Sequence, residues 1–184
     1  VFFDGGDYAY TYRANAQGLE LWRSDGTDIG TILLKQFNAA VGTASSIKSL
    51  VNLNGTLFIA GNTVAEGSEL WKSDGTLSGT VLLKDINVGG SGSSPGGVIN
   101  INNTIFFRAY TASGGDELWK TDGTEAGTQA LDIYGFFSST PQQFIQSGNT
   151  VYYIQNGYNY RTQIWKTDGT ALGTSRPSSG AACG

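Results

Sequence analysis

The sequence predicts an all-β fold, a β-propeller made of four-stranded antiparallel blades, and three observations carry this prediction. A twelve-residue motif occurs four times, as ELWRSDGTDIGT, ELWKSDGTLSGT, ELWKTDGTEAGT and QIWKTDGTALGT. The tryptophans of successive copies (Trp22, Trp71, Trp119 and Trp165) are 49, 48 and 46 residues apart, a period typical of repeat architectures. The 184 residues include 27 glycines and only 14% charged residues, a composition typical of short strands joined by many turns.

The second unit, residues 47–86, shows the expected strands most clearly. Asn54-Gly55 is a strong hairpin signal, because both central residues of a type I′ turn need positive φ. The run TLFIAGN after it is almost continuously apolar, as in a strand covered on both faces. With the turn in DGTLSGT this predicts a four-stranded meander, whose strands are residues 47–53, 56–62, 68–73 and 80–86.

The other units repeat this order, with defects in the first and the last. The third unit predicts strands at residues 97–101, 104–110, 116–121 and 128–134. The fourth predicts strands at 143–147, 150–156 and 162–167, with no strand after Thr174. In the first, residues 1–5 are expected to supply part of the second strand, and the first strand is missing. The alternating YAYTY run that follows belongs either to a variable loop, residues 4–18, or to a longer second strand with one exposed face. The four repeats are therefore approximately 1–36, 47–86, 97–134 and 143–184, in a complete ring or in part of a larger one. A β-sandwich or a solenoid is the alternative, but a sandwich would not require such strict self-similarity.

The motif ELWKSDGT, the GT pair that closes it, the following LLKDI and the preceding NGTLFIA resemble the ELWxxDGT repeat family. These are large secreted or surface-associated bacterial proteins. The resemblance covers essentially the whole chain and implies propeller-like repeats outside the cell, but no particular reaction or ligand. The last copy departs from the pattern at Gln163-Ile164 and in its missing strand, so the fourth blade is expected to be incomplete.

Composition excludes several classes of function. The net charge is −4 with no basic cluster, which argues against nucleic-acid binding. The sequence has no apolar run near twenty residues, so no transmembrane segment is expected. It contains no histidine, so a hydrolase would have to use carboxylates. Its single cysteine, Cys183, cannot form an intrachain disulfide, and its role is open. Because Val1 begins inside an expected strand, the polypeptide is interpreted as processed or incomplete.

The repeated residues are interpreted as scaffold. Each DGT aspartate (Asp25, Asp74, Asp122 and Asp168) is expected to accept backbone N–H bonds across its turn. A calcium ion at each turn is the alternative, although one carboxylate per turn is few for such a site. The four tryptophans are expected to pack between blades, with a ring of sugar-binding platforms as the alternative. The glutamates that begin the motif (Glu20, Glu69 and Glu117) are expected to serve as hydrogen-bond acceptors. The basic residues after the tryptophans (Arg23, Lys72, Lys120 and Lys166) are expected to be solvated or paired with nearby aspartates.

Sequence differences between the repeats indicate where a ligand would bind. In a four-stranded meander, the loops after the second and fourth strands share one rim, and here those loops vary while the other turns repeat. Loops on a rigid scaffold often carry binding residues. Aromatic residues among Asn, Ser and Gly suit sugars or protein surfaces, although scattered surface tyrosines are also ordinary. The candidate ligand-binding residues are Tyr8, Tyr10, Tyr12, Tyr110, Tyr134, Phe136, Tyr158 and Tyr160.

The sequence therefore predicts a non-enzymatic extracellular module of a bacterium that binds or assembles: adhesin-like, lectin-like or part of a surface layer or filament. Its expected partners are a glycan or a surface protein, with self-association as a further possibility. No cofactor is expected, apart from the calcium alternative. The competing hypothesis is a glycan-active enzyme that uses carboxylates near the variable rim, such as Asp4, Asp7 or Asp116.

Overall fold

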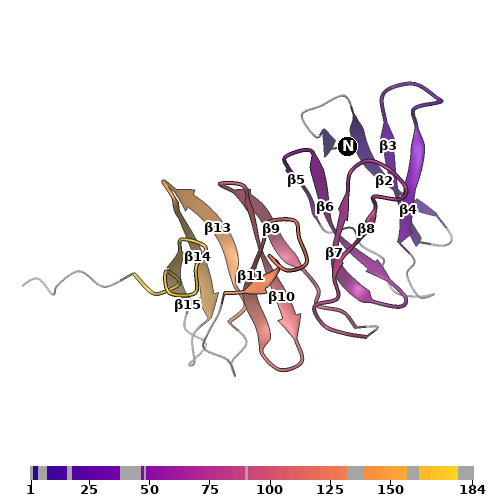
Figure 1. Cartoon of the computed structure of the whole chain (residues 1–184). Helices are drawn as coiled ribbons and strands as arrows, with labels where there is room; N and C mark the ends of the chain where they lie inside the picture. Colours follow the sequence, from indigo (N-terminus) through magenta and orange to yellow (C-terminus); the bar gives the residue numbers. More distant parts are fainter. Residues whose placement is uncertain are drawn as a thin grey trace, which may run out of the picture.

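The computed structural model describes residues 2–3, 8–15, 18–37, 47, 49–89, 91–131, 139–156 and 162–177. These residues form four separate antiparallel sheets, which follow one another in a row along the chain (Figure 1). In each sheet the strands lie in sequence order, so every sheet is a meander. We call the sheets blades 1 to 4. Among the described residues, none forms a helix long and apolar enough to cross a membrane.

Blades 2 and 3 are the two central meanders. Blade 2 consists of β5 (Ser49–Leu53), β6 (Thr56–Thr63), β7 (Gly67–Ser73) and β8 (Val81–Lys84). Blade 3 consists of β9 (Gly96–Ile101), β10 (Thr104–Thr111), β11 (Gly115–Thr121) and β12 (Gln129–Ala130). The hairpin between β5 and β6 has positive φ at Asn54 (51°) and Gly55 (83°), as its sequence predicts. Both meanders are confirmed. The predicted strand 128–134 is shorter than expected, and residues 132–138 lie outside the described part.

Blade 1 differs from its prediction. It contains β1 (Phe2–Phe3), β2 (Ala9–Asn15), β3 (Gly18–Ser24) and β4 (Ile32–Phe37). The first strand, which was expected to be missing, is β1, and residues 1–5 therefore do not begin the second strand. The second strand is β2, which pairs residue for residue with β3, from Ala9 opposite Ser24 to Asn15 opposite Gly18. Of the two interpretations of the alternating YAYTY run, a loop or a longer second strand, the strand is the correct one.

Blade 4 has three strands in the described residues, β13 (Gln142–Ser147), β14 (Thr150–Asn156) and β15 (Thr162–Thr167). No strand follows Thr174 within the described residues 175–177, as predicted for that stretch, and residues 178–184 lie outside the described part. In its place, Ser175 forms a single antiparallel bridge with Lys166.

The blades pack face to face, and the leucine and the tryptophan of the motif lie on opposite faces of their blade. β9 lies against both β5 and β13, so the first strands of successive blades are neighbours. Three apolar cores lie between the blades. The core between blades 1 and 2 contains Leu21 and Trp71, that between blades 2 and 3 contains Leu70 and Trp119, and that between blades 3 and 4 contains Leu118 and Trp165. The leucine of each motif thus faces the following blade, and the tryptophan faces the preceding one.

Candidate functional site

The DGTxxGT turn is a closed network of hydroxyl and carboxylate hydrogen bonds, best seen in blade 2. Oδ1 of Asp74 accepts bonds from the backbone N–H (2.9 Å) and the hydroxyl (2.7 Å) of Thr76. Oγ1 of Thr76 accepts the backbone N–H of Gly79 at 2.9 Å. The hydroxyl of Thr80 lies 2.7 Å from that of Ser73 and donates to the carbonyl of Thr76 at 2.6 Å. The carboxylate-to-threonine bonds recur at Asp25, Asp122 and Asp168.

The second glycine of the motif is explained by this network. A Cβ atom built on Gly79 would stand 2.0 Å from Oδ1 of Asp74, and the equivalent glycines of the other turns have the same neighbour. A side chain there would displace the carboxylate from its bonds to threonine. The fourfold GT pair is therefore a requirement of the turn itself.

The aspartates of these turns are held in their charged form. Hydrogen bonds from the threonine hydroxyl and backbone N–H, in that order, lower the pKa of Asp25, Asp74, Asp122 and Asp168 below the ordinary value. A general acid needs the opposite shift, so these carboxylates are poor proton donors near neutral pH. No group of three or more Cys, Asp or Glu that could hold a metal ion is found in the described residues.

Glu69 begins the motif of blade 2 and is fully buried. Oε1 accepts the backbone N–H of Asn87 (3.1 Å) and of Ser93 (2.8 Å), and Oε2 accepts the Ser93 hydroxyl (2.5 Å). Burial raises its pKa, although these bonds act in the other direction. Glu69 thus ties the loop after β8 to β7. Glu20 instead accepts the indole N–H of Trp22 at 3.0 Å, so the motif glutamates share an acceptor role with different donors.

The basic residue after each tryptophan links neighbouring blades. Arg23 donates to the carbonyl of Gly75 (2.8 Å), Lys72 to that of Gly123 (2.8 Å), and Lys120 to that of Gly169 (2.5 Å). Each acceptor is the glycine of the next blade's DGT turn. Sequence reasoning interpreted these cations as solvated or paired with aspartate. Each cation and its acceptor are 49 to 52 residues apart in the sequence, so the sequence alone does not indicate the pairing, which forms only when adjacent blades are stacked.

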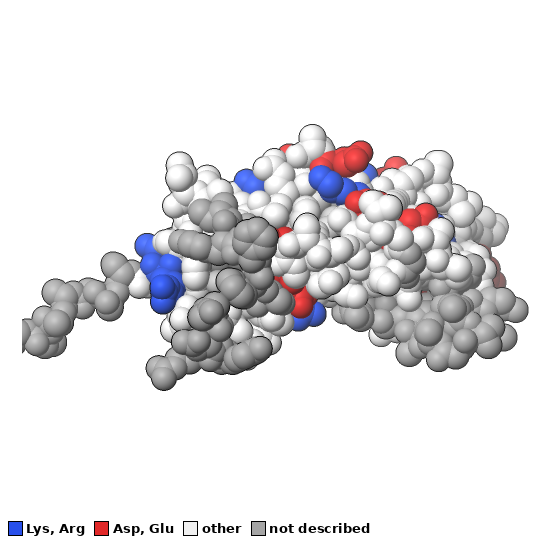
Figure 2. Space-filling view, turned by 90° about the horizontal axis from the view of Figure 1, so that it is seen from below, with Lys and Arg blue, Asp and Glu red and all other residues white. Residues whose placement is uncertain are grey.

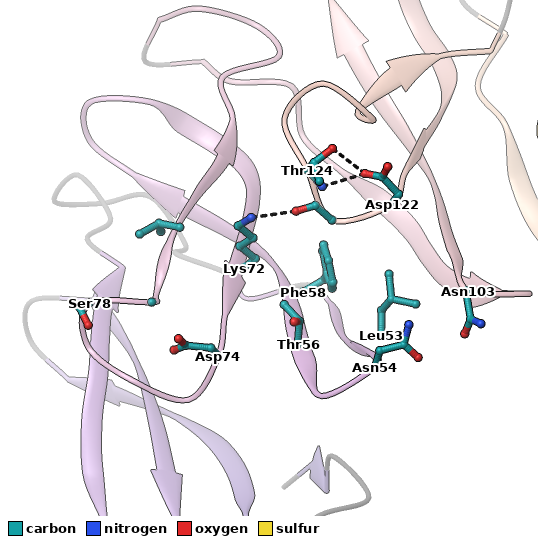
Figure 3. Close-up of a pocket in the computed structure, with 13 residues that line it drawn as sticks. Leu53, Asn54, Thr56, Phe58, Lys72, Asp74, Ser78, Asn103, Asp122 and Thr124 are labelled. Atoms are coloured by element: carbon teal, nitrogen blue, oxygen red, sulfur yellow. Dashed lines mark hydrogen bonds between the residues drawn. The ribbon is translucent and has the colours of Figure 1, made fainter.

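The rim that carries the repeated turns is hollowed between blades. A groove of about 440 Å³ lies between blades 2 and 3 (Figure 3). Phe58 and Leu53 form its apolar part, while Asn54 and Asn103 come from the hairpin turns of the two blades. The bond from Lys72 to the Gly123 carbonyl crosses it. A smaller groove, about 300 Å³, lies at the same position between blades 3 and 4. The sequence analysis expected a binding surface only on the opposite rim.

The tyrosines expected on the variable rim do not form one surface in the described residues. Tyr10 is a core residue, 1% exposed, so its prediction as a ligand contact is wrong: strand alternation in β2 turns it toward blade 2. Tyr8 is half-buried, and the guanidinium of Arg23 stacks 4.0 Å from its ring centroid. Tyr12 (51%) and Tyr110 (42%) are exposed, but they lie on different blades. The remaining candidates, Tyr134, Phe136, Tyr158 and Tyr160, lie outside the described residues.

The carboxylates of the glycan-enzyme hypothesis do not meet as a pair in the described part. Asp116 is 3.5 Å from the guanidinium of Arg108, in a half-buried ion pair. Asp4 and Asp7 lie outside the described residues. The face shown in Figure 2 carries scattered charges of both signs.

No protein-family model and no curated protein matches the chain. Solved structures do match it. A mutant of puromycin hydrolase complexed with PGG has a TM-score of 0.62 at 15% identity, over 98% of this chain and 28% of that one. A structure from a study of two prolyl endopeptidases has a TM-score of 0.56 at 13% identity, over 89% and 23%. Prolyl oligopeptidase B from Galerina marginata has a TM-score of 0.51 at 17% identity, over 90% and 23%.

These similarities show the fold. The neighbours contain β-propellers, so the four stacked meanders are propeller-like blades. The chain spans about a quarter of the length of these proteins. The predicted non-enzymatic extracellular binding or structural module is contradicted, because the matching structures are propeller domains of peptidases. The physical reason for the error is that the repeated motif encodes blade packing, which is the same whatever the propeller is used for.

Proposed function

We propose that these blades belong to the propeller of a peptide hydrolase, in which they form a rigid wall beside a catalytic site supplied by other residues. The observation that carries the proposal is the match of 98% of the chain to puromycin hydrolase at a TM-score of 0.62. The other matches with TM-scores above 0.5 include prolyl endopeptidases. In one of those studies, inter-domain dynamics has a role in catalysis and specificity.

The chemistry of the described residues supports a scaffold role within such an enzyme. The chain has no histidine, so it offers no imidazole as a general base. The turn aspartates are engaged by threonines, with pKa values lowered by those bonds. The buried Glu69 is committed to Asn87 and Ser93. These blades therefore contribute shape and rigidity, and the bond-breaking groups come from elsewhere in the enzyme.

The grooves between the blades suggest how the scaffold would contact a peptide. The groove between blades 2 and 3 combines the exposed side chain of Val81 with the side-chain amides of Asn54 and Asn103. Side-chain amides both donate to and accept from a peptide backbone, and an exposed apolar residue can contact a peptide side chain. In this proposal the repeated-turn rim faces the substrate.

Capture of the native protein tests this function. An antibody raised against the 184-residue chain would be used to purify its native antigen from the source organism. The antigen would then be incubated with a mixed peptide library, and the products identified by mass spectrometry. We expect peptide cleavage that is lost when the antibody is first saturated with the recombinant chain. If the intact antigen, verified by its mass, cleaves no member of the library, the proposal is wrong.

We also propose that the protein belongs to the ELWxxDGT repeats and works outside a bacterial cell, supported by the fourfold motif and the turn-rich, charge-poor composition. The same antibody tests the location. Fractionation of the source cells should place the antigen in the medium or at the cell surface, and an antigen confined to the cytoplasm would contradict this part.

A further inference from the structure

The three interfaces between blades are built from the same parts. The preceding blade supplies an apolar residue just before its tryptophan (Leu21, Leu70 or Leu118), and all three leucines are fully buried. The following blade supplies a tryptophan to the same core. The preceding blade also supplies a cation, which donates to the carbonyl of the following blade's DGT glycine. The buried apolar residue and the cation of the preceding blade, which we call the preceding face, are therefore enough to identify one side of such an interface.

Blade 4 presents two parts of such a preceding face on its outer side, the apolar residue before the tryptophan and the cation after it. Ile164 occupies the motif position of Leu118, yet it is 60% exposed, and the neighbouring Ile145 is 64% exposed. Together with Tyr152 and Ile154 they line a shallow apolar hollow of about 570 Å³. Lys166 occupies the position of Lys120, and the described residues give its ammonium group no hydrogen-bond acceptor. Exposed apolar surfaces of this kind mark interaction sites.

The outer face of blade 1, at the other end of the row, differs from the faces that blades 2, 3 and 4 turn toward their preceding blades. Opposite the motif tryptophan, β2 carries Thr11 where blades 2, 3 and 4 carry Ile59, Phe107 and Tyr153. Two residues further along β2 is the exposed Arg13, where blades 2 and 3 have Gly61 and Ala109. The outer face of blade 1 thus carries the motif tryptophan, Trp22, but polar residues beside it on β2. Burial of Arg13 against the apolar face of blade 4 would be unfavourable, which argues against simple head-to-tail stacking of copies.

We propose that the outer face of blade 4 docks a fifth blade of the same type. The occupant has apolar residues on its second strand, a tryptophan on its third strand, and a DGT-type turn. Its tryptophan covers Ile164 and Ile145, and the glycine carbonyl of its turn accepts the ammonium group of Lys166. The three interfaces within the chain already join blades in this way, and the outer face of blade 4 continues the series. This proposal does not depend on the proposed peptide hydrolysis.

The test is an in-frame duplication. Thr128 and Thr174 hold equivalent places in the motif, so a second copy of residues 129–174 can be inserted directly after Thr174. The insertion gives blade 4 the sequence that forms β12 in blade 3, and it adds a copy of blade 4 as the fifth blade. Urea unfolding of the extended and the original chain would be followed by circular dichroism. The matched control is the extended chain whose inserted copy carries alanine in place of its tryptophan.

We expect Ile164→Asp to leave the urea midpoint of the original chain unchanged, because the side chain is exposed there. In the extended chain the same substitution at blade 4 should lower the midpoint by on the order of 1 M, as should the control. Ile164→Cys in a Cys183→Ser background should react with a maleimide in the original chain and be protected in the extended one.

Three results would overturn the proposal. One is an equal effect of Ile164→Asp in both chains, and another is a cysteine at 164 that remains reactive in the extended chain. An extended chain that fails to fold while the original folds would also count against it. Sedimentation of the original chain tests whether a second copy of the chain is the occupant instead of a fifth blade. A dimer that Ile164→Asp dissociates would mean that a second copy covers this face.

Discussion

Individual residues of the motif have separate and assignable tasks. In blade 2, Asp74 and Thr76 close the turn, Gly79 leaves room for the carboxylate, and Ser73 and Thr80 join the two strands by their hydroxyls. The turn aspartates could be predicted from the sequence as hydrogen-bond acceptors, because Asp before Gly is a common turn pattern. The hydroxyl pair could not, since the seven-residue spacing brings its members together only when the strands fold back.

The first prediction concerns Gly79. Gly79→Ala places a Cβ against the carboxylate of Asp74, which must give up its bonds to Thr76. We expect the free energy of unfolding, from urea titration, to fall by about 1 kcal/mol. The control is Leu77→Ala in the same turn, whose side chain is 66% exposed, and which should change the unfolding free energy by less than about 0.5 kcal/mol. Equal effects of the two substitutions would contradict the role given to this glycine.

The second prediction concerns pH. Burial raises the pKa of Glu69 in the folded protein, so the folded state binds that proton more tightly than the unfolded state. Its contribution to stability is therefore greatest below the unfolded value of 4.5 and declines as the pH rises through the folded pKa. Glu69→Gln removes this dependence. Urea unfolding between pH 4 and 7 should give a smaller loss of stability with rising pH in the variant.

Asp74 supplies a control of opposite sign. Its folded pKa is lowered by bonds from Thr76, so its contribution is present above the unfolded value of 3.8 and is lost as the pH falls below it. Asp74→Asn should therefore flatten the profile only at acid pH and leave the range above 4.5 unchanged. A Glu69→Gln profile that matches the wild type above pH 4.5 would mean that Glu69 is not the group responsible.

At the scale of elements, the strands within a blade follow from local sequence signals, whereas the contacts between blades depend on how the blades stack. The hairpin at Asn54-Gly55 and the strands of blades 2 and 3 follow from turn chemistry and apolar patterning, so they could be predicted. β2 could be predicted only as one of two alternatives because it is half polar: Thr11 and Arg13 face away from blade 2, and only Tyr10 marks its buried side. The cations that link blades were misread for another reason, because their acceptor is a backbone carbonyl, which no side-chain pattern reveals.

The third prediction concerns this link. Lys72→Met keeps the aliphatic stem and removes the bond to the Gly123 carbonyl, at a cost of about 1 kcal/mol in unfolding free energy. The matched control is Lys166→Met, at the same motif position in blade 4, where the described residues offer the ammonium group no acceptor. The control should leave the urea midpoint unchanged. Comparable destabilisation by both substitutions would show that the stem, and not the bond, holds the blades together.

The whole molecule is a stack whose stability resides between the blades. Each core draws on two sheets, and the edge-to-face contact of Phe37 with Trp71, at 5.6 Å between ring centroids, joins blade 1 to blade 2. The sequence predicted this packing role for the tryptophans. It did not predict use of the scaffold, because the four copies agree where they stack, and several of the loops where they disagree (residues 38–46, 132–138 and 157–161) lie outside the described residues.

The fourth prediction tests the stack. Trp119 is 8% exposed between blades 2 and 3, and Trp119→Ala should lower the free energy of unfolding by about 3 to 5 kcal/mol through lost burial and the cavity left behind. Trp22 has the same motif position but lies half-buried on the outer face of blade 1. Trp22→Ala should cost clearly less in the same urea titration. If the two substitutions cost the same, the tryptophans stabilise their own sheets and not the interfaces.

The link between each cation and the next glycine carbonyl has a consequence for the gene. Every repeat encodes one donor half and one acceptor half of the same joint, so unequal recombination between any two repeats yields a reading frame whose new neighbours already match. Blade number can then rise or fall in single genetic events, with no period during which an unmatched surface must be repaired by point mutation. The near-identity of the four motifs keeps such exchange possible.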